Sequence, residues 1–396
     1  MANESFRYKV SLNYVNSKNS EIMINSEQIQ YIAIDKDYEN TNMPVVAIVA
    51  SIEKNILDDM ILNIDNNIVT LGIYRYDINN QSDNITKKYF HDRFIYIIHD
   101  DISKTAIVDY PNGEDREGLY RDITIWLLPQ DAVNNNRQSI NGIFKNASTN
   151  SLILQSVNYI GNLLLELVQY DNKYEQVIIP PLDSISSYIS YLNNNLSVFY
   201  DTPYRFFIDF DMAYIVSSSG KVTEAKNQQI STVEINISNI LPESENDGGM
   251  SIDTRHKKYV VDINNSYCDF VKNNVTNKLV NEVTTIDASG NVVSKTIEGN
   301  ESKVTTKINK IINLTNTDAN AINNIAASIE NNNIQITVSK NDLDTNMFTI
   351  NKEYIITNVP EREEYNGRYI LCSTKQFFMK QTDYFLMNTI LKFKKV

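Results

Sequence analysis

A stretch near the middle of the chain, residues 180–220, separates two blocks of strand-forming sequence. It opens with Pro180 and Pro181, which cannot donate backbone hydrogen bonds and which favour an extended entry. Apolar residues at helical spacing follow over 182–192, and residues 198–216 are dense in aromatic and β-branched side chains, which favour strands. We therefore expect a short helix and an aromatic strand pair at the centre of the fold.

Short strand patterns fill the chain before residue 131. Residues 6–14 alternate between apolar and polar side chains, and residues 43–52 form a continuous apolar run that is typical of a strand buried on both faces. The spacing over 53–62 predicts a helix. Further strands are expected at 21–34, 68–78, 89–98, 105–110 and 120–128. Because strands and helices do not alternate, residues 1–130 are predicted to form a compact antiparallel β-barrel or β-sandwich domain.

The pattern changes over residues 131–195, for which we expect a helical connector domain. Residues 134–136 are predicted to be a polar linker and residues 139–147 a short helix, and residues 151–170 have the strongest helical pattern of the chain. Strand patterns return from residue 196 and predict a second strand-rich unit over 196–396. An accessory insertion is expected at about 240–310, in which an exposed hairpin arm at 265–305 turns at Asp287–Asn291. The expected class is α+β, mainly β with some helix.

Charge and composition exclude several classes of function. The formal net charge is −13, and the basic runs at 255–258 and 392–395 are short, so the chain lacks the basic patch that grips nucleic acid. Cys268 and Cys372 lie in strand patterns without a CxxC motif, which indicates buried thiols in a reducing compartment. The apolar run 153–170 is interrupted by polar residues, and residues 1–10 contain no hydrophobic region, so we expect neither a membrane anchor nor a signal segment.

Candidate chemistry is sparse. His91 stands beside Asp92, and His99 precedes the pair Asp100 and Asp101, but these spacings match no metal motif. No nucleophile elbow, zinc-protease motif, phosphate-binding loop or dinucleotide fingerprint occurs in the sequence. We therefore expect no catalytic, cofactor-binding or metal site, and no enzyme.

One carboxylate pair keeps an enzymatic alternative open. Asp209 and Asp211 flank Phe210 and would point to the same face of a strand in an aromatic neighbourhood, and two carboxylates suffice for glycoside hydrolysis. The alternative interpretation is structural: the two aspartates lie on the solvated face of a strand. The single tryptophan, Trp126, lies in a strand pattern and is expected to pack in the core.

These features resemble the central hub proteins of contractile phage tail baseplates, a family that includes the late control D protein and the base of type VI secretion spikes. Three segments carry the resemblance. Residues 6–52 have a strand–turn–strand layout, residues 177–220 have a helix followed by aromatic strands of the form FY…FFxDxDxxYxxxS, and residues 351–396 are a closing set of strands. Residues 240–310 fit the family least well.

The resemblance implies a homotrimer in which each subunit supplies two barrels like those of the tail tube protein. It implies a symmetry adaptor that joins the hexameric tail tube to a central spike or cell-wall-degrading protein, contacts baseplate wedge proteins and lines a channel for DNA. It also implies a place in the virion after assembly in the host cytoplasm. The alternatives are a tail tube terminator or wedge adaptor with one barrel, and a glycan-binding or glycan-cleaving tail protein that uses Asp209 and Asp211. Replacing both aspartates with Asn is expected to leave assembly intact if the protein is a hub.

Overall fold

The structure is a computed structural model of the 396-residue chain. It describes the following residues: 6–16, 18, 20–63, 67–77, 87–99, 120–160, 163–165, 173–196, 204–210, 212–217, 232–239, 250–254, 257–265, 280–286, 292–298, 311–312, 333–338, 348–358 and 363–395.

The N-terminal block is built from strands and one helix, as its sequence periodicity predicts. The predicted helix at 53–62 is confirmed, and the predicted strands are confirmed except 105–110, which lies outside the described residues. The elements are β1 (Phe6–Val15), β2 (Glu21–Ile24), β3 (Ile29–Asp37), β4 (Val45–Glu53), α1 (Lys54–Leu62), β5 (Ile68–Asp77), β6 (Lys87–His99) and β7 (Tyr120–Pro129). Strand β4 alternates between buried and half-buried side chains, so the prediction that it is buried on both faces is wrong.

The middle block is less helical than predicted. Residues 139–147 contribute to strand β8 and not to a helix, residues 134–136 end a helix, and the helix expected over 151–170 ends at Ile160. Strands β8 and β10 pair with each other although about 30 residues separate them, and such distant pairing overrides local helix preference. The elements are α2 (Gln130–Asn136), β8 (Gly142–Ser148), α3 (Thr149–Ile160), β9 (Leu163–Leu165), β10 (Lys173–Ile179) and α4 (Ile185–Leu196).

The C-terminal block returns to strands, as predicted. The hairpin expected within 265–305 is present as an antiparallel pair, β16 and β17. The elements are β11 (Tyr204–Ile208), β12 (Ala213–Ser217), β13 (Thr232–Asn239), β14 (Met250–Thr254), β15 (Lys257–Asn265), β16 (Val280–Ile286), β17 (Val292–Glu298), β18 (Ile311–Ile312), β19 (Asn333–Val338), β20 (Glu353–Thr357), the 3₁₀ turn η4 (Glu363–Tyr365), β21 (Gly367–Lys380) and β22 (Phe385–Lys395).

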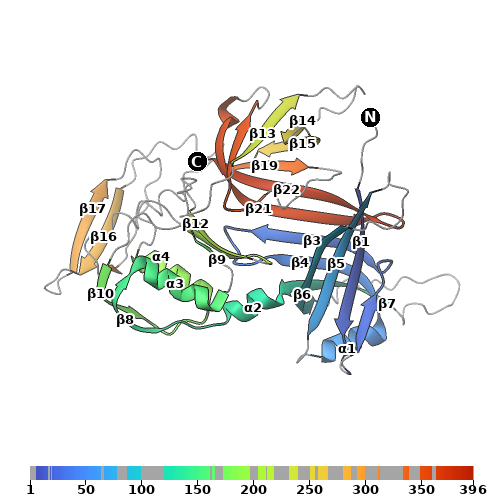
Figure 1. Cartoon of the computed structure of the whole chain (residues 1–396), viewed down its shortest axis with the longest axis horizontal. Coiled ribbons are helices and arrows are strands. Elements are labelled where there is room, and N and C mark those ends of the chain that lie inside the picture. The colour runs from blue at the N-terminus through green and yellow to red at the C-terminus, as the bar shows by residue number, and fades with distance from the viewer. Residues whose placement is uncertain are drawn as a thin grey trace.

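Strands of the first and last blocks belong to one 14-stranded sheet, whose pairings close into two circuits. The first circuit runs β1–β5–β6–β7–β4–β3–β21–β22 and returns to β1 through the residue pair Tyr8 and Phe385. The second circuit runs β21–β20–β13–β14–β15–β19–β22 and returns to β21. Figure 1 shows the long strands β21 and β22 side by side, reaching from β13, β15 and β19 at one end to β1 at the other. The β21–β22 hairpin is therefore common to both circuits.

The mainly β class with few short helices is confirmed, and the large sheet is antiparallel except where β13 and β20 run parallel. The division into domains at 1–130, 131–195 and 196–396 stays a prediction.

Three hydrophobic cores fill the described structure. The first core lies in the first circuit and includes Tyr8, Phe94 and Phe378, and the second lies in the second circuit and includes Tyr354 and Phe393. The third core lies among α2–α4, β8 and β10 and is built on side chains such as Leu152, Val177, Tyr188 and Leu192.

Candidate functional site at the junction of three cores

The aromatic strand pair predicted at the centre of the chain is the hairpin β11–β12. Its two strands pair antiparallel from Tyr204 and Ser217 to Ile208 and Ala213, and β12 also pairs parallel with β9 of the middle block. The hairpin therefore connects the middle block to the rest of the chain.

Side chains of this hairpin enter all three cores. Because successive side chains of a strand point to opposite faces, one face packs into the third core and the other into the second. The third-core face carries Phe206, Ile208, Ala213 and Ile215, and the second-core face carries Phe207, Tyr214 and Val216. Phe210, in the connection between the strands, packs against the first core, with its ring centroid 4.6 Å from that of Phe90.

An ion pair fastens the end of the hairpin to the first circuit. The Lys36 ammonium of β3 lies 2.8 Å from one Asp209 carboxylate oxygen and 2.9 Å from the other. The Asp209 side chain is only 7% exposed, and its Oδ1 also accepts a hydrogen bond from the Phe210 amide. Lys36 Nζ also lies 4.9 Å from the centre of the Phe210 ring, within range of a cation–π contact. The ion pair and the aromatic contact thus hold the same point of the hairpin.

A buried arginine fastens the other end of the hairpin to the second circuit. The Arg205 guanidinium donates hydrogen bonds to the backbone carbonyls of Leu371 on β21 and of Ile350. Arg205 is 6% exposed and its Nε has no hydrogen-bond partner among the described residues. Because a buried cation is costly unless its donors are bonded, these carbonyls fix the place of the hairpin against the second circuit.

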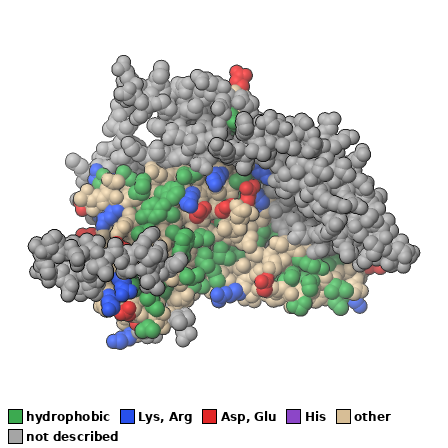
Figure 2. Space-filling model, turned by 180° about the vertical axis from the view of Figure 1, so that it is seen from behind, with side chains coloured by type: hydrophobic (Ala, Val, Ile, Leu, Met, Phe, Trp, Pro, Cys, Tyr) green, Lys and Arg blue, Asp and Glu red, His purple; other side chains and the backbone are tan. Residues whose placement is uncertain are grey.

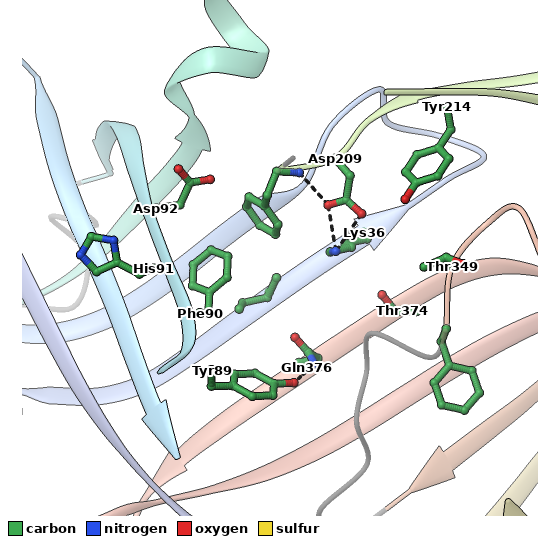
Figure 3. Close-up of a pocket in the computed structure, with 13 residues that line it drawn as sticks. Lys36, Tyr89, Phe90, His91, Asp92, Asp209, Tyr214, Thr349, Thr374 and Gln376 are labelled. Carbon is green, nitrogen blue, oxygen red and sulfur yellow. Dashed lines mark hydrogen bonds and ion pairs between the residues drawn. The ribbon is translucent and has the colours of Figure 1, made fainter. Parts of the chain in front are cut away.

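A cavity of about 560 Å³ opens beside the ion pair, where β3, β6, β21 and the β11–β12 connection meet. Figure 3 shows Lys36 and Asp209 facing each other, with His91 and Asp92 apart from them beyond Phe90. The cavity is lined by Ile34, Lys36, Tyr89, Phe90, His91, Asp92, Asp209, Phe210, Tyr214, Phe348, Thr349, Thr374 and Gln376. Tyr89 accepts a 2.7 Å hydrogen bond from the Gln376 amide across its floor.

The structure does not bring those candidate residues that it describes together as a catalytic pair or a metal site. Asp209 lies in the cavity but is held by Lys36, and Asp211 lies outside the described residues. His91 is exposed, and Asp100 and Asp101 lie outside the described residues. Among the described residues, no three His, Cys, Asp or Glu side chains come together in a group that could hold a metal ion.

Two residues of this junction were not found from the sequence. Lys36 and Arg205 each stand in a strand pattern, where a basic residue is normally interpreted as facing solvent. Their partners are Asp209, 173 positions away, and Leu371, 166 positions away, so no local signal reveals the contacts.

A second notable surface is the outer face of the first circuit. Cross-strand partners form an apolar row over five neighbouring strands, made of Ile97, Trp126, Ala47, Ala33 and Phe377. Trp126 is 42% exposed and Ile97 53% exposed, so the expectation that Trp126 packs in the core is wrong. A space-filling view from behind shows hydrophobic side chains gathered on the described surface, with basic and acidic groups beside them (Figure 2).

None of the described helices has the length and apolar character that a membrane crossing requires.

The sequence matches the family described as Bacteriophage PBS1 gene 109 protein over residues 3–396. The chain belongs to this family. The match spans the segments of this chain that form both circuits and the junction between them. A search of curated proteins finds no match.

Solved structures show where this family's fold occurs elsewhere. A tail protein from Neisseria meningitidis MC58 is similar with a TM-score of 0.53 at 9% identity, covering 98% of this chain and 97% of that one. A chain of the lidded Francisella PdpA–VgrG complex is similar with a TM-score of 0.51 at 10% identity, covering 100% of this chain and 53% of that one. The resemblance drawn from the sequence is thus confirmed: the chain is a phage family member with the fold of a tail protein.

Proposed function

We propose that this protein is the structural hub of a contractile phage tail baseplate. In this role it is a homotrimer that joins the hexameric tail tube to the central spike, and it has no catalytic activity of its own. The observation that carries the proposal is the pair of closed strand circuits within one chain. Three copies with two circuits each present six barrel-like units, which match the six-fold symmetry of a tube above a three-fold spike.

The domain division proposed with this role is a first barrel at 1–130, a connector at 131–195 and a second barrel at 196–396. The shared fold with the Neisseria tail protein supports a place in the phage tail, and the net charge of −13 suits a channel wall that DNA passes without binding. Trp126 and Ile97 are cross-strand partners and are 42% and 53% exposed, which supports a protein that works inside an assembly, because exposed apolar side chains that gather on one face often mark an interaction surface.

The proposed partners are the tail tube proteins on one rim, the spike or a cell-wall-degrading protein on the other, and the baseplate wedge proteins around the outside. The similar Francisella chain is part of a PdpA–VgrG complex, which supports a partner of the spike kind. The protein is proposed to be assembled in the host cytoplasm and to reside in the virion.

The alternatives find less support. A tube terminator or wedge adaptor needs one barrel-like circuit, whereas this chain closes two. Glycan cleavage needs two carboxylates that can act on the sugar, whereas Asp209 forms an ion pair with Lys36 within the junction.

The mass of the purified protein in solution, measured by light scattering after size exclusion, tests the proposal. The expected result is a stable particle near three times 45.4 kDa, either alone or on addition of the tail tube protein of the same phage. A dimer or hexamer, or a monomer under both conditions, would contradict the hub function.

A further inference from the structure

The β21–β22 hairpin changes neighbours along its length. At its base, residues 367–369 of β21 pair with β20, and residues 389–394 of β22 pair with β19. Toward its tip, residues 373–379 of β21 pair with β3, and Phe385 of β22 pairs with Tyr8 of β1. The paired strands β21 and β22 therefore belong to both circuits.

The change of neighbours occurs at an irregularity in β21, where the register with β22 shifts between Leu371 and Ser373. A bulge of this kind bends a strand and redirects its pairing. Its backbone is held from both sides, because the Tyr38 amide donates a 2.9 Å hydrogen bond to the Cys372 carbonyl and Arg205 donates to the Leu371 carbonyl. The bend is therefore a fixed feature of the fold.

Side chains of the same hairpin complete both cores. Toward the tip, Phe378, Phe385 and Met387 are at most 2% exposed and belong to the first core. The Phe378 ring packs edge-on against Tyr8, with centroids 5.3 Å apart. At the base, the second core includes Phe393, whose ring centroid lies 5.0 Å from that of Tyr354.

We propose that this hairpin is a closing element that makes the two circuits one cooperative unit. Without it, β3 presents an unpaired edge and the first core lacks three of its buried side chains. The first circuit, although made mostly of the first 130 residues, closes only when the last strands of the chain have paired. A substitution that destabilises either core then lowers the stability of both circuits, because neither circuit can unfold without separating the β21–β22 hairpin from it.

The inference is about folding and does not depend on the proposed hub function. A variant that lacks β21 and β22 would keep an open first circuit, with an unpaired edge on β3. Such an edge is a template for aggregation.

Amide hydrogen exchange on the full-length protein tests this coupling. Phe393→Leu removes volume only from the second core, where Phe393 contacts Phe348 and Tyr354. The expected result is that the slowest amides of β4 and β7, in the first circuit, exchange about tenfold faster, because they exchange through unfolding of the whole unit. Ile143→Ala, at a position 62% exposed in β8, is the control and should leave these amides unchanged.

A second variant tests the coupling in the opposite direction, from the first core to the second circuit. Ile125→Val removes one methyl from the first core at a residue of β7 with 0% exposure, and should quicken the slowest amides of β20 in the second circuit by several-fold. If each variant speeds exchange only in its own circuit, the circuits unfold independently and the proposal is overturned. Because both changes are mild and oligomeric mass is measured separately, failure of this coupling is distinguishable from failure of the hub function.

Discussion

At the scale of single residues, the Lys36–Asp209 pair shows that an aspartate whose sequence context is compatible with catalysis can have a structural role. Asp209 is 7% exposed and Lys36 22% exposed, so both groups have lost much of their hydration. The pair repays that loss only while both partners remain, because an unpaired buried charge is strongly unfavourable. Asp209 also raises the pKa of the neighbouring Tyr38 hydroxyl, whose burial is the larger cause of that shift.

Asp209→Asn is therefore expected to lower the free energy of unfolding by about 3 kcal/mol, because it leaves the Lys36 ammonium without its counter-charge. Chemical denaturation checks this value. The matched control is Asp35→Asn, which breaks the more exposed Lys375–Asp35 pair and should cost about 0.5 kcal/mol. Equal losses in the two variants would contradict a structural role for Asp209. A large loss would also mean that replacing Asp209 and Asp211 together is not a clean test of catalysis.

At the scale of elements, β5 shows how close packing within the first circuit limits what a strand can carry. Gly72 lies opposite Ser11 of β1, and the Tyr74 ring folds over it. A Cβ at this position would lie 2.6 Å from Ser11 Oγ and 2.8 Å from the Tyr74 hydroxyl oxygen. The glycine is needed for space at this point and not for an unusual backbone angle.

Gly72→Ala is expected to cost about 2 kcal/mol in unfolding free energy, because the Ser11 and Tyr74 side chains must leave their positions. Thermal or denaturant unfolding measures the loss. Combining the change with Tyr74→Leu, which removes the ring, should make the added methyl less costly than in the wild-type background. An alanine variant as stable as the wild type would show that the neighbours move freely.

At the scale of the whole molecule, buried tyrosines occur in all three cores. Burial, with a smaller effect of Asp59, raises the pKa of Tyr96 in the first core to about 12. Burial also raises the pKa of Tyr354 in the second core and of Tyr188 in the third. Tyr96 and Tyr188 donate their hydroxyl protons to the carbonyls of Met60 and Leu152, so ionisation would break these bonds as well.

The whole protein is therefore expected to lose stability at alkaline pH. A folded-state pKa above the unfolded value of 10.0 gives stability that is complete below about pH 10 and is lost as the pH rises toward about 12. Denaturation midpoints measured across this range should fall, and Tyr96→Phe should reduce the slope by removing one of the titrating groups. A constant midpoint would contradict neutral, buried tyrosines in the folded state.

Local sequence patterns were sufficient for elements whose partners are near in the chain. The alternation of β1, the apolar spacing of α1 and the hairpin β16–β17 were predictable because period and turn chemistry act over a few residues. The aromatic density of residues 198–216 likewise indicated a central strand pair, although not that its side chains divide among three cores.

What the sequence alone determined is a mainly β chain with an aromatic centre and few helices. Tertiary structure decided the rest: that residues 142–148 form a strand, that Trp126 faces outward, and that Lys36 meets Asp209. It also decided that residues 373–387 close a circuit begun by residues 6–15. The physical reason is that these outcomes depend on pairing and burial between segments that are not neighbours in the chain, from about 30 residues apart for β8 and β10 to far more for β1 and β22. The periodicity within a segment does not specify its partner.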